Sequence, residues 1–176
     1  MIKVKQKQLQ KLAVAALLAA ITCVATFVIK IPSPATNGYF NLGDCFVLLS
    51  GWLIGPVYGA LAAGLGSALA DILSGYVQYA PATFVIKALM AAAAYFVVKA
   101  MSKNPFAGKI LGGIAAETIM VLGYFGYEAV ILGYGIAAAG SIFSNVMQGI
   151  VGIIAGTAVT TAIEKNKNLN SFFKKR

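Results

Sequence analysis

The chain of 176 residues contains no histidine and little charge, with only five acidic and 14 basic residues. Without histidine, neither a serine–histidine nucleophile nor a cysteine–histidine metal site can form. The phosphate-binding pattern Gly-x-x-x-x-Gly-Lys-Ser/Thr is also missing, so the chain is not expected to hydrolyse ATP by that route. We therefore expect a protein that is not an enzyme and holds neither a metal ion nor a cofactor.

Charged residues make up 11% of the chain, whereas soluble domains carry about 25%. Hydrophobic residues make up 60% and form long continuous runs rather than alternating with polar residues. Such runs are typical of membrane helices, which need about 20 apolar residues, and not of outer-membrane barrels. The two cysteines, Cys23 and Cys45, fall in or beside these runs and are interpreted as small buried hydrophobic side chains.

The sequence predicts an all-α integral membrane protein with six transmembrane helices in one bundle, formed by residues 1–176 as a single domain. The expected helices are Leu12–Ile29, Asp44–Ile54, Val57–Leu73, Ala82–Met101, Ile110–Leu132 and Ser141–Ile163. A turn at Gly55-Pro56 separates the second from the third.

Of the 14 basic residues, only Lys30 and Lys87 lie outside three groups near the N-terminus, near residues 99–109 and near the C-terminus. Six helices place these three groups on one side of the membrane. By the positive-inside rule, both termini are therefore predicted to be cytoplasmic. The charge thus reflects topology and does not indicate binding to nucleic acid. The predicted location is a cell membrane, with lipid around the bundle.

A charged side chain inside a bilayer is costly and usually faces a cavity or a partner. Most polar candidates gather toward the predicted outer half, where tyrosine rings and polar groups suit a small flat ligand. Gln148 lies beside this set. The predicted ligand-binding residues are Tyr39, Asn41, Asp71, Tyr79, Lys87, Glu117, Tyr124, Glu128 and Asn145.

Structural interpretations stay open for several of these residues. Asp71 and Asp44 are also suited to helix ends, and Lys87 to pairing with Asp71 or Glu128. Glu117, which is deeper than the others, could serve a hydrogen bond between helices. In the stretch Tyr39–Asp44, Asn41 is expected to contact the ligand, and Asp44 is expected to cap the following helix.

Four stretches carry a family resemblance: Tyr39–Asp44, Gly66–Asp71, Tyr79–Thr83 and Gly123–Glu128. With the six helices and the alanine-rich first helix, the whole chain resembles the substrate-binding S components of energy-coupling factor (ECF) vitamin transporters. Within that family it is most similar to the riboflavin-type and hydroxymethylpyrimidine- or pyridoxine-like members.

The resemblance implies high-affinity capture of a vitamin or vitamin precursor, and assembly with a transmembrane T component and two cytosolic ATPases. It also implies docking to the T component through small residues of the first helix, here Ala15, Ala16, Ala19 and Ala20. Packing of that face within the bundle is the alternative. The favoured ligand is a small pyrimidine or pyridine, with riboflavin as its competitor. Two further hypotheses are an autonomous proton-coupled carrier, with Glu117 and Glu128 as relay groups, and a structural protein that binds no ligand.

Overall fold

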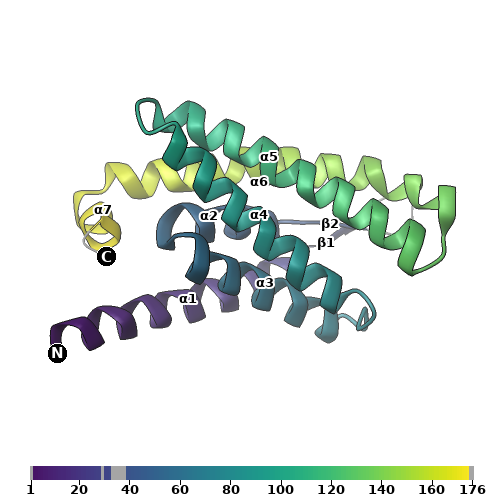
Figure 1. Cartoon of the computed structure of the whole chain (residues 1–176), viewed down its shortest axis with the longest axis horizontal. Coiled ribbons are helices and arrows are strands. Elements are labelled where there is room, and N and C mark those ends of the chain that lie inside the picture. The colour runs from purple at the N-terminus through teal and green to yellow at the C-terminus, as the bar shows by residue number, and fades with distance from the viewer. Residues whose placement is uncertain (1, 29, 33–38, 175–176) are drawn as a thin grey trace.

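The computed structural model describes residues 2–28, 30–32 and 39–174, and most of them are helical (Figure 1). The described elements, in chain order, are α1 (Ile2–Val28), β1 (Lys30–Pro32), β2 (Tyr39–Asn41), α2 (Gly43–Ile54), α3 (Pro56–Leu73), α4 (Ala80–Ala100), α5 (Pro105–Gly126), the π-helix η1 (Tyr127–Ile131), the 3-10 helix η2 (Gly135–Ala139), α6 (Gly140–Lys165) and α7 (Lys167–Lys174). Each of the six predicted helices has a counterpart.

Among the described residues, five segments are long and apolar enough to cross a membrane: Gln8–Val28, Pro56–Leu73, Ala80–Ala100, Pro105–Ile131 and Gly135–Lys165. The sixth predicted span, α2, has only 12 residues. At 1.5 Å per residue it covers about 18 Å of a hydrocarbon layer about 30 Å thick. The all-α membrane fold is confirmed, and α2 is the one helix of the bundle that is too short to span by itself.

Helix α2 lies at the centre of the bundle, where it contacts α1, α3, α4 and α6. Nine of its 12 residues are buried, and Val47 and Leu48 are fully so. They pack with buried residues of α4 and α5, among them Met90 and Met120. A helix that is apolar all round belongs inside a bundle, which explains how so short a segment is retained.

The predicted turn after α2 is present at Gly55-Pro56. Gly55 has a φ of 86°, a conformation that residues with a side chain rarely adopt. Pro56 is the first residue of α3, where its missing N–H costs nothing because that group has no partner inside the helix. The turn returns the chain at once, so that α2 and α3 pack as a hairpin.

The two ends of the bundle differ. In Figure 1 both chain termini and the connection between α4 and α5 lie at one end. The α3–α4 connection, η1 and η2 lie at the other end. The arrangement brings together the segments that carry the basic residues, as the sequence predicts. The cytoplasmic location of this end remains a prediction.

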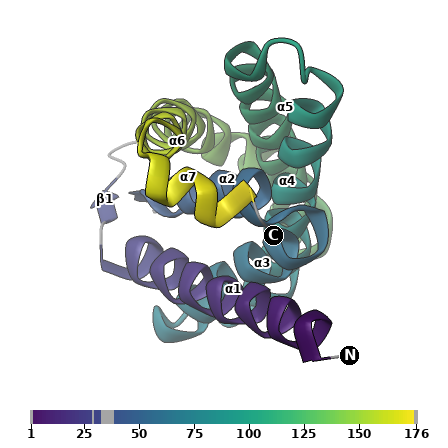
Figure 2. The same ribbon diagram turned by 90° about the vertical axis from the view of Figure 1, so that its left-hand side faces the viewer.

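The structure differs from the sequence prediction in two connecting segments. The sequence analysis places no helix or strand between Ile29 and Asp44, but β1 and β2 pair there as an antiparallel ribbon with Lys30 opposite Asn41. Pairing satisfies backbone groups that would otherwise lack partners. The C-terminal segment, expected only as a basic tail, contains α7, which lies across the end of the bundle in Figure 2.

Close packing of α2 against α4 gives a first testable prediction. A Cβ atom on Gly51 would lie 2.2 Å from the carbonyl oxygen of Ala91, so Gly51→Ala must push the two helices apart. We expect a loss of about 1–3 kcal/mol, the range typical of overpacked cores, measured as a lower thermal midpoint in detergent. Gly126→Ala is the matched control, because a Cβ there meets no atom within 4 Å. Equal midpoints for the two variants would contradict this packing.

Candidate ligand cavity

A cavity of about 590 Å³ opens among α1, β2, α3, α4, α5, η2 and α6, at the end of the bundle away from the termini. Ligand pockets are typically about 300–1,000 Å³ in volume. Its wall mixes aromatic rings, carboxylates, amides and hydroxyl groups. This combination is suited to bind a polar, ring-containing small molecule.

Seven of the nine predicted ligand-binding residues line this cavity: Asn41, Asp71, Tyr79, Lys87, Tyr124, Glu128 and Asn145. They come from β2 and from helices far apart in the sequence. Their gathering at one end of the bundle agrees with the depth that the sequence predicted for them. Their contact with a ligand remains a prediction.

The other two predicted residues do not line the cavity in the described structure. Tyr39 begins β2, but its side chain lies outside the part that the structure describes. Glu117 is buried in α5 against Gly149 and Gly152 of α6. Neither of its carboxylate oxygens has a hydrogen-bond partner, so the hydrogen bond between helices that was considered for it is not formed. Glu117 lies about two turns along α5 from the cavity-lining Tyr124, with Met120 between them in the sequence.

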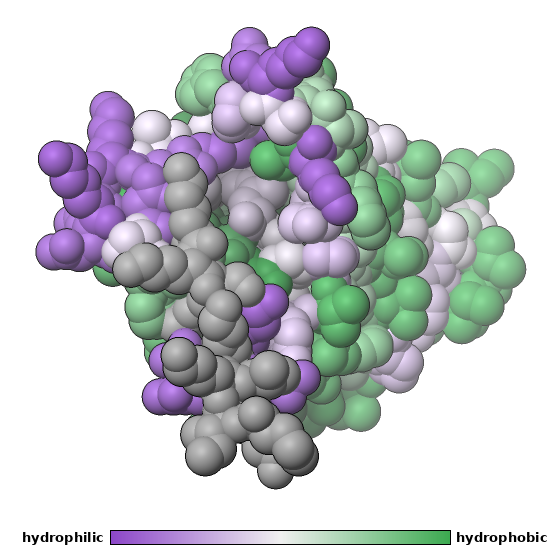
Figure 3. Space-filling view, turned by 60° about the vertical axis from the view of Figure 1, so that its left-hand side comes forward, coloured by the Kyte–Doolittle hydropathy of each residue, from purple (hydrophilic) through white to green (hydrophobic). Residues whose placement is uncertain are grey.

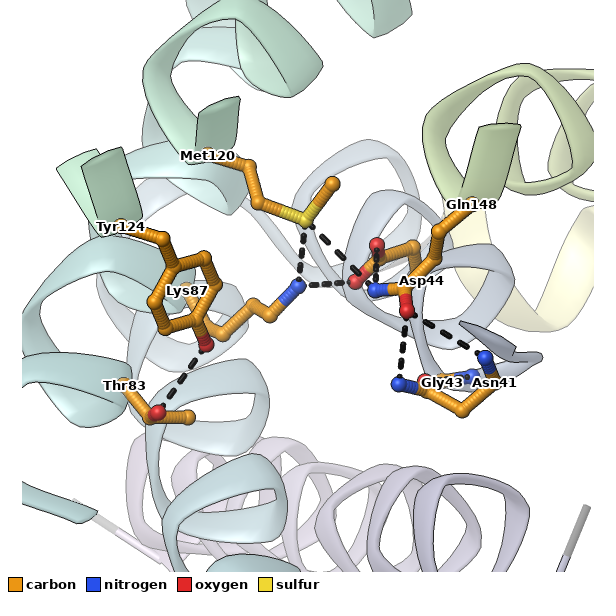
Figure 4. Close-up of polar contacts among 8 residues, drawn as sticks. All are labelled: Asn41, Gly43, Asp44, Thr83, Lys87, Met120, Tyr124 and Gln148. Carbon is orange, nitrogen blue, oxygen red and sulfur yellow. Dashed lines mark hydrogen bonds and ion pairs between the residues drawn. The ribbon is translucent and has the colours of Figure 1, made fainter. Parts of the chain in front are cut away.

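The charge of Lys87 is balanced by Asp44, not by Asp71 or Glu128 as the sequence suggested (Figure 4). Asp44 is 1% exposed and Lys87 is 5% exposed. The Lys87 ammonium also donates to the Met120 sulfur at 2.9 Å and lies 5.6 Å from the centre of the Tyr124 ring. An opposite charge and a ring face both stabilise an ammonium group that is removed from water.

The other Asp44 oxygen accepts a hydrogen bond from the Gln148 side-chain N–H₂ group at 2.6 Å. The Gln148 carbonyl in turn accepts from the Asn41 side chain at 2.8 Å and from the Asn41 backbone at 3.2 Å. Figure 4 shows this chain of contacts running from Lys87 to the ribbon. It connects α4, α2, α6 and β2 at the cavity wall.

The expected capping role of Asp44 is therefore wrong. Leu42 is the residue that precedes α2 and makes no side-chain cap, and Asp44 lies inside the first turn with its carboxylate bonded to Lys87 and Gln148. Asn41 makes the contact with the start of α2 instead, because its side-chain carbonyl accepts a hydrogen bond from the backbone N–H of Gly43 at 2.9 Å. A short amide two residues before a backbone N–H commonly forms such a turn.

Glu128 forms a second polar group at the opposite wall. Its carboxylate accepts hydrogen bonds from the Tyr79 hydroxyl at 3.2 Å and from the Ser141 hydroxyl. Partial burial and the neighbouring Glu128 carboxylate raise the pKa of Tyr79 above its ordinary value. Tyr79 thus keeps its proton at neutral pH and remains a donor. The Tyr79 ring lies 5.8 Å from the Tyr127 ring and 6.2 Å from the Tyr76 ring.

Some polar groups of the wall have no protein partner within the described chain. Within the described residues, the buried hydroxyls of Thr26 and Ser67 make no hydrogen bond, although both residues line the cavity. Leaving a buried polar group unpaired costs about 1–3 kcal/mol. Such groups in a cavity wall point to polar atoms of a ligand.

The sequence analysis did not select Thr26, Ser67, Ser141 or Gln148 as ligand-binding residues, yet all four line the cavity. A signal existed for Ser67, which precedes Asp71 by four residues and so shares its helix face. Gln148 follows the selected Asn145 by three residues in the same way. Thr26 lies in the apolar first helix, where nothing in the sequence indicated that it faces a cavity.

Removing the Ser67 hydroxyl should separate binding from stability. Ser67→Ala deletes a buried group that lacks a protein partner, so the thermal midpoint without ligand should stay unchanged or rise. If a ligand satisfies this hydroxyl, affinity should fall about 2–10-fold, the equivalent of one neutral hydrogen bond. Calorimetric titration measures the affinity. The control is Ser50→Ala, which removes a buried hydroxyl away from the cavity that donates to the Phe46 carbonyl. Unchanged affinity in Ser67→Ala would remove Ser67 from the binding site.

Residues 6–165 of the chain match the family described as ECF-type riboflavin transporter, S component. This match covers most of the sequence. The chain belongs to that family of S components. It is a substrate-binding subunit of a vitamin transporter and a multi-pass membrane protein, and this family role is not itself catalytic.

Two relatives and a solved structure are similar to this S component over nearly their whole length. An uncharacterized protein from Pyrococcus woesei is 37% identical over 144 residues, which is 81% of this chain and 93% of that protein. The thiamine precursor transporter HmpT of Lactococcus lactis subsp. cremoris is 27% identical over 173 residues, or 96% of each chain. A structure titled as the S component of a bacterial ECF transporter aligns with a TM-score of 0.71, at 26% identity, covering 90% of this chain and 97% of the other.

The predicted docking face of α1 is divided in this S component. Ala15 is buried in the bundle, and the backbone of Ala19 approaches Gly66 of α3 closely. Ala16 and Ala20 are exposed, on a face about 100° around the helix from Ala15 and Ala19. Ala15 and Ala19 therefore pack within the bundle, which was the alternative to docking that the sequence analysis considered. Docking of a partner remains a prediction for Ala16 and Ala20.

Proposed function

We propose that this S component binds a vitamin precursor of the hydroxymethylpyrimidine or pyridoxine class in the cavity. The observation that carries the proposal is the pair of buried hydroxyl groups in the cavity wall that have no partner among the described residues, those of Thr26 and Ser67. A small heterocycle with ring nitrogens, an amino group or a hydroxymethyl group presents the donors and acceptors that these side chains need. The similarity to HmpT, named as a thiamine precursor transporter, points to the same class.

In this proposal, each wall group has a chemical task. Tyr79 and Tyr124 offer ring surfaces against which a flat heterocycle stacks. Glu128 accepts a hydrogen bond from an amino or hydroxyl group of the substrate, and Asn145 both donates and accepts. Lys87 holds the Tyr124 ring in position through a cation–π contact, and its ammonium group is itself paired with Asp44.

Riboflavin is the second candidate ligand. The cavity volume of about 590 Å³ is generous for a single small ring, and the matched family is described as riboflavin transporters. A flavin would place its larger ring system along the tyrosines and its hydroxylated chain against the hydroxyl-bearing wall. The same residues then serve a different ligand, so only binding measurements decide between the two classes.

Transport is proposed to require partners. The chain has no phosphate-binding loop, so ATP hydrolysis would occur in two cytosolic ATPases, and a transmembrane T component would dock at the exposed Ala16 and Ala20. In this arrangement the end that holds the termini faces the cytoplasm and the cavity faces outward. A proton-coupled carrier would instead import substrate alone, without ATP, in liposomes with a pH gradient.

The deciding experiment is mass spectrometry of small molecules released from the gently purified and then denatured protein. It is followed by titration of apo protein with hydroxymethylpyrimidine, pyridoxine and riboflavin. The proposal expects release of a pyrimidine or pyridine compound and at least tenfold tighter binding of that class than of riboflavin. Release and tight binding of a flavin alone would overturn the ligand class. Failure of all three probes to bind would overturn the binding function of the cavity.

A further inference from the structure

Helix α7 is fixed at the end of the bundle that holds the chain termini. Only Asn166 separates it from α6, and the Asn166 side chain accepts the backbone N–H groups of Asn168 at 3.1 Å and Leu169 at 3.2 Å. The Asn170 side chain donates to the Glu164 carbonyl at 2.8 Å. The sharp change of direction is therefore built in, and α7 does not continue the line of α6 into solvent (Figure 2).

The apolar residues of α7 lie at positions 169, 172 and 173, on one side of the helix. Phe173 packs against the cluster that contains Ala15, Leu18, Ile54 and Ala62 and so ties α7 to α1–α3. Leu169 and Phe172 are 45% and 47% exposed. One part of the apolar side is used inside the protein, and the other part is presented outward.

The depth of α7 follows from the length of α6. The segment Gly135–Lys165 is long and apolar enough to cross a membrane, and α7 starts two residues after it ends. Because α7 lies across the bundle end, it stays near that depth along its whole length. This is the region of lipid headgroups, where amphipathic helices place apolar side chains toward the acyl chains and lysines toward phosphates.

The same end carries a surplus of positive charge. Lys99, Lys103, Lys165 and Lys167 are exposed, whereas the acid Glu164 is paired with the buried Lys109. In the space-filling view of Figure 3, hydrophilic residues gather on the end that comes forward, and hydrophobic residues cover the receding flank. Such a surface attracts anionic lipid headgroups.

We propose that α7 is an interfacial anchor that binds the headgroup layer of anionic phospholipids through Leu169 and Phe172, with Lys165 and Lys167 contacting the phosphates. The lipid surface is favoured over a protein partner because the exposed apolar side chains lie at headgroup depth and beside exposed lysines. The anchor is separate from the ligand cavity, which lies at the other end of the bundle.

A single tryptophan reporter tests the anchor in the full-length chain. Trp52 is the only tryptophan, so Trp52→Phe with Phe172→Trp leaves one indole in α7. The protein is placed in nanodiscs of phosphatidylcholine with or without phosphatidylglycerol. We expect blue-shifted emission that is quenched more by bromines near the headgroup than by bromines at the chain end. Leu89→Trp, exposed on the membrane-spanning α4, should show the opposite depth order.

The role of charge is tested with the double variant Lys165→Glu and Lys167→Glu. In the unaltered charge background, quenching by headgroup bromines should be stronger when phosphatidylglycerol is present, and the double variant should abolish this difference. As a measurement without a tryptophan substitution, amide hydrogen exchange in α7 of the unaltered chain should slow when phosphatidylglycerol is present. Red-shifted, unquenched emission in both lipids, with unchanged exchange, would overturn the proposal. Protection of α7 only after addition of the transporter's other membrane subunit would also overturn it, and would assign this face to a protein partner.

Discussion

Replacing Asp44 with alanine is expected to destabilise this S component by about 3–5 kcal/mol, the cost typical of leaving one member of a buried ion pair alone. Asp44→Ala removes the counter-charge of Lys87 and the acceptor of Gln148 together. Both partners are buried, so water cannot replace the lost contacts. We expect a much lower thermal midpoint in detergent and a loss of folded protein during purification.

A double variant distinguishes the pair from a general need for an acid at position 44. Asp44→Leu together with Lys87→Met removes both charges and fills similar volumes. Such replacements of buried pairs are often neutral or stabilising. The double variant should therefore recover most of the thermal midpoint that Asp44→Ala loses. If it is as unstable as Asp44→Ala, the uncompensated Lys87 charge is not the cause.

Changing Glu128 to glutamine is expected to weaken binding of hydroxymethylpyrimidine about 10–100-fold. A carboxylate is in general a stronger hydrogen-bond acceptor than an amide, and hydrogen bonds to charged groups are worth about 1.5–3 kcal/mol. Tyr79 and Ser141 are hydroxyl donors that an amide oxygen can still accept, so the fold should persist. Titration calorimetry on apo protein measures the affinity, and the thermal midpoint verifies folding.

The control for Glu128 is Glu164→Gln, at the other end of the bundle. Glu164 pairs with Lys109 and does not line the cavity. This variant should bind the pyrimidine with unchanged affinity. Equal affinities of Glu128→Gln and the unaltered protein for the pyrimidine would exclude Glu128 as a ligand contact, even if other residues of the cavity prove to be required.

Much of the fold was predictable because the sequence features that a membrane requires are local ones. Long apolar runs, basic groups at their ends and the Gly55-Pro56 turn each indicate one feature without knowledge of the rest. The gathering of Asp71, Glu128 and Asn145 at one depth follows from helix length and direction alone. These inferences need no knowledge of how the helices are rotated.

Partners and facing directions were not predictable in this way. Lys87 had three acids within reach of its predicted depth, and its pairing with Asp44 depends on how α2 and α4 cross. Glu117 lies on α5, as Tyr124 does, but its deeper position in the helix places it against glycines of α6. The helix α7 was missed because its eight residues, with only three apolar side chains, form barely two turns, which is too short a stretch for a helical period to be recognised in the sequence.

The short length of α2 bears on the depth of the cavity in the membrane. Since α2 covers about 18 Å of a layer about 30 Å thick, its first residues lie roughly 12 Å inside the hydrocarbon boundary when its last residues are level with the other face. Asn41 and Lys87 of the cavity wall lie at or near this level. In the proposed orientation, a ligand bound at this level would already have crossed part of the permeability barrier, and the remaining barrier beneath it would be the packed bundle around α2.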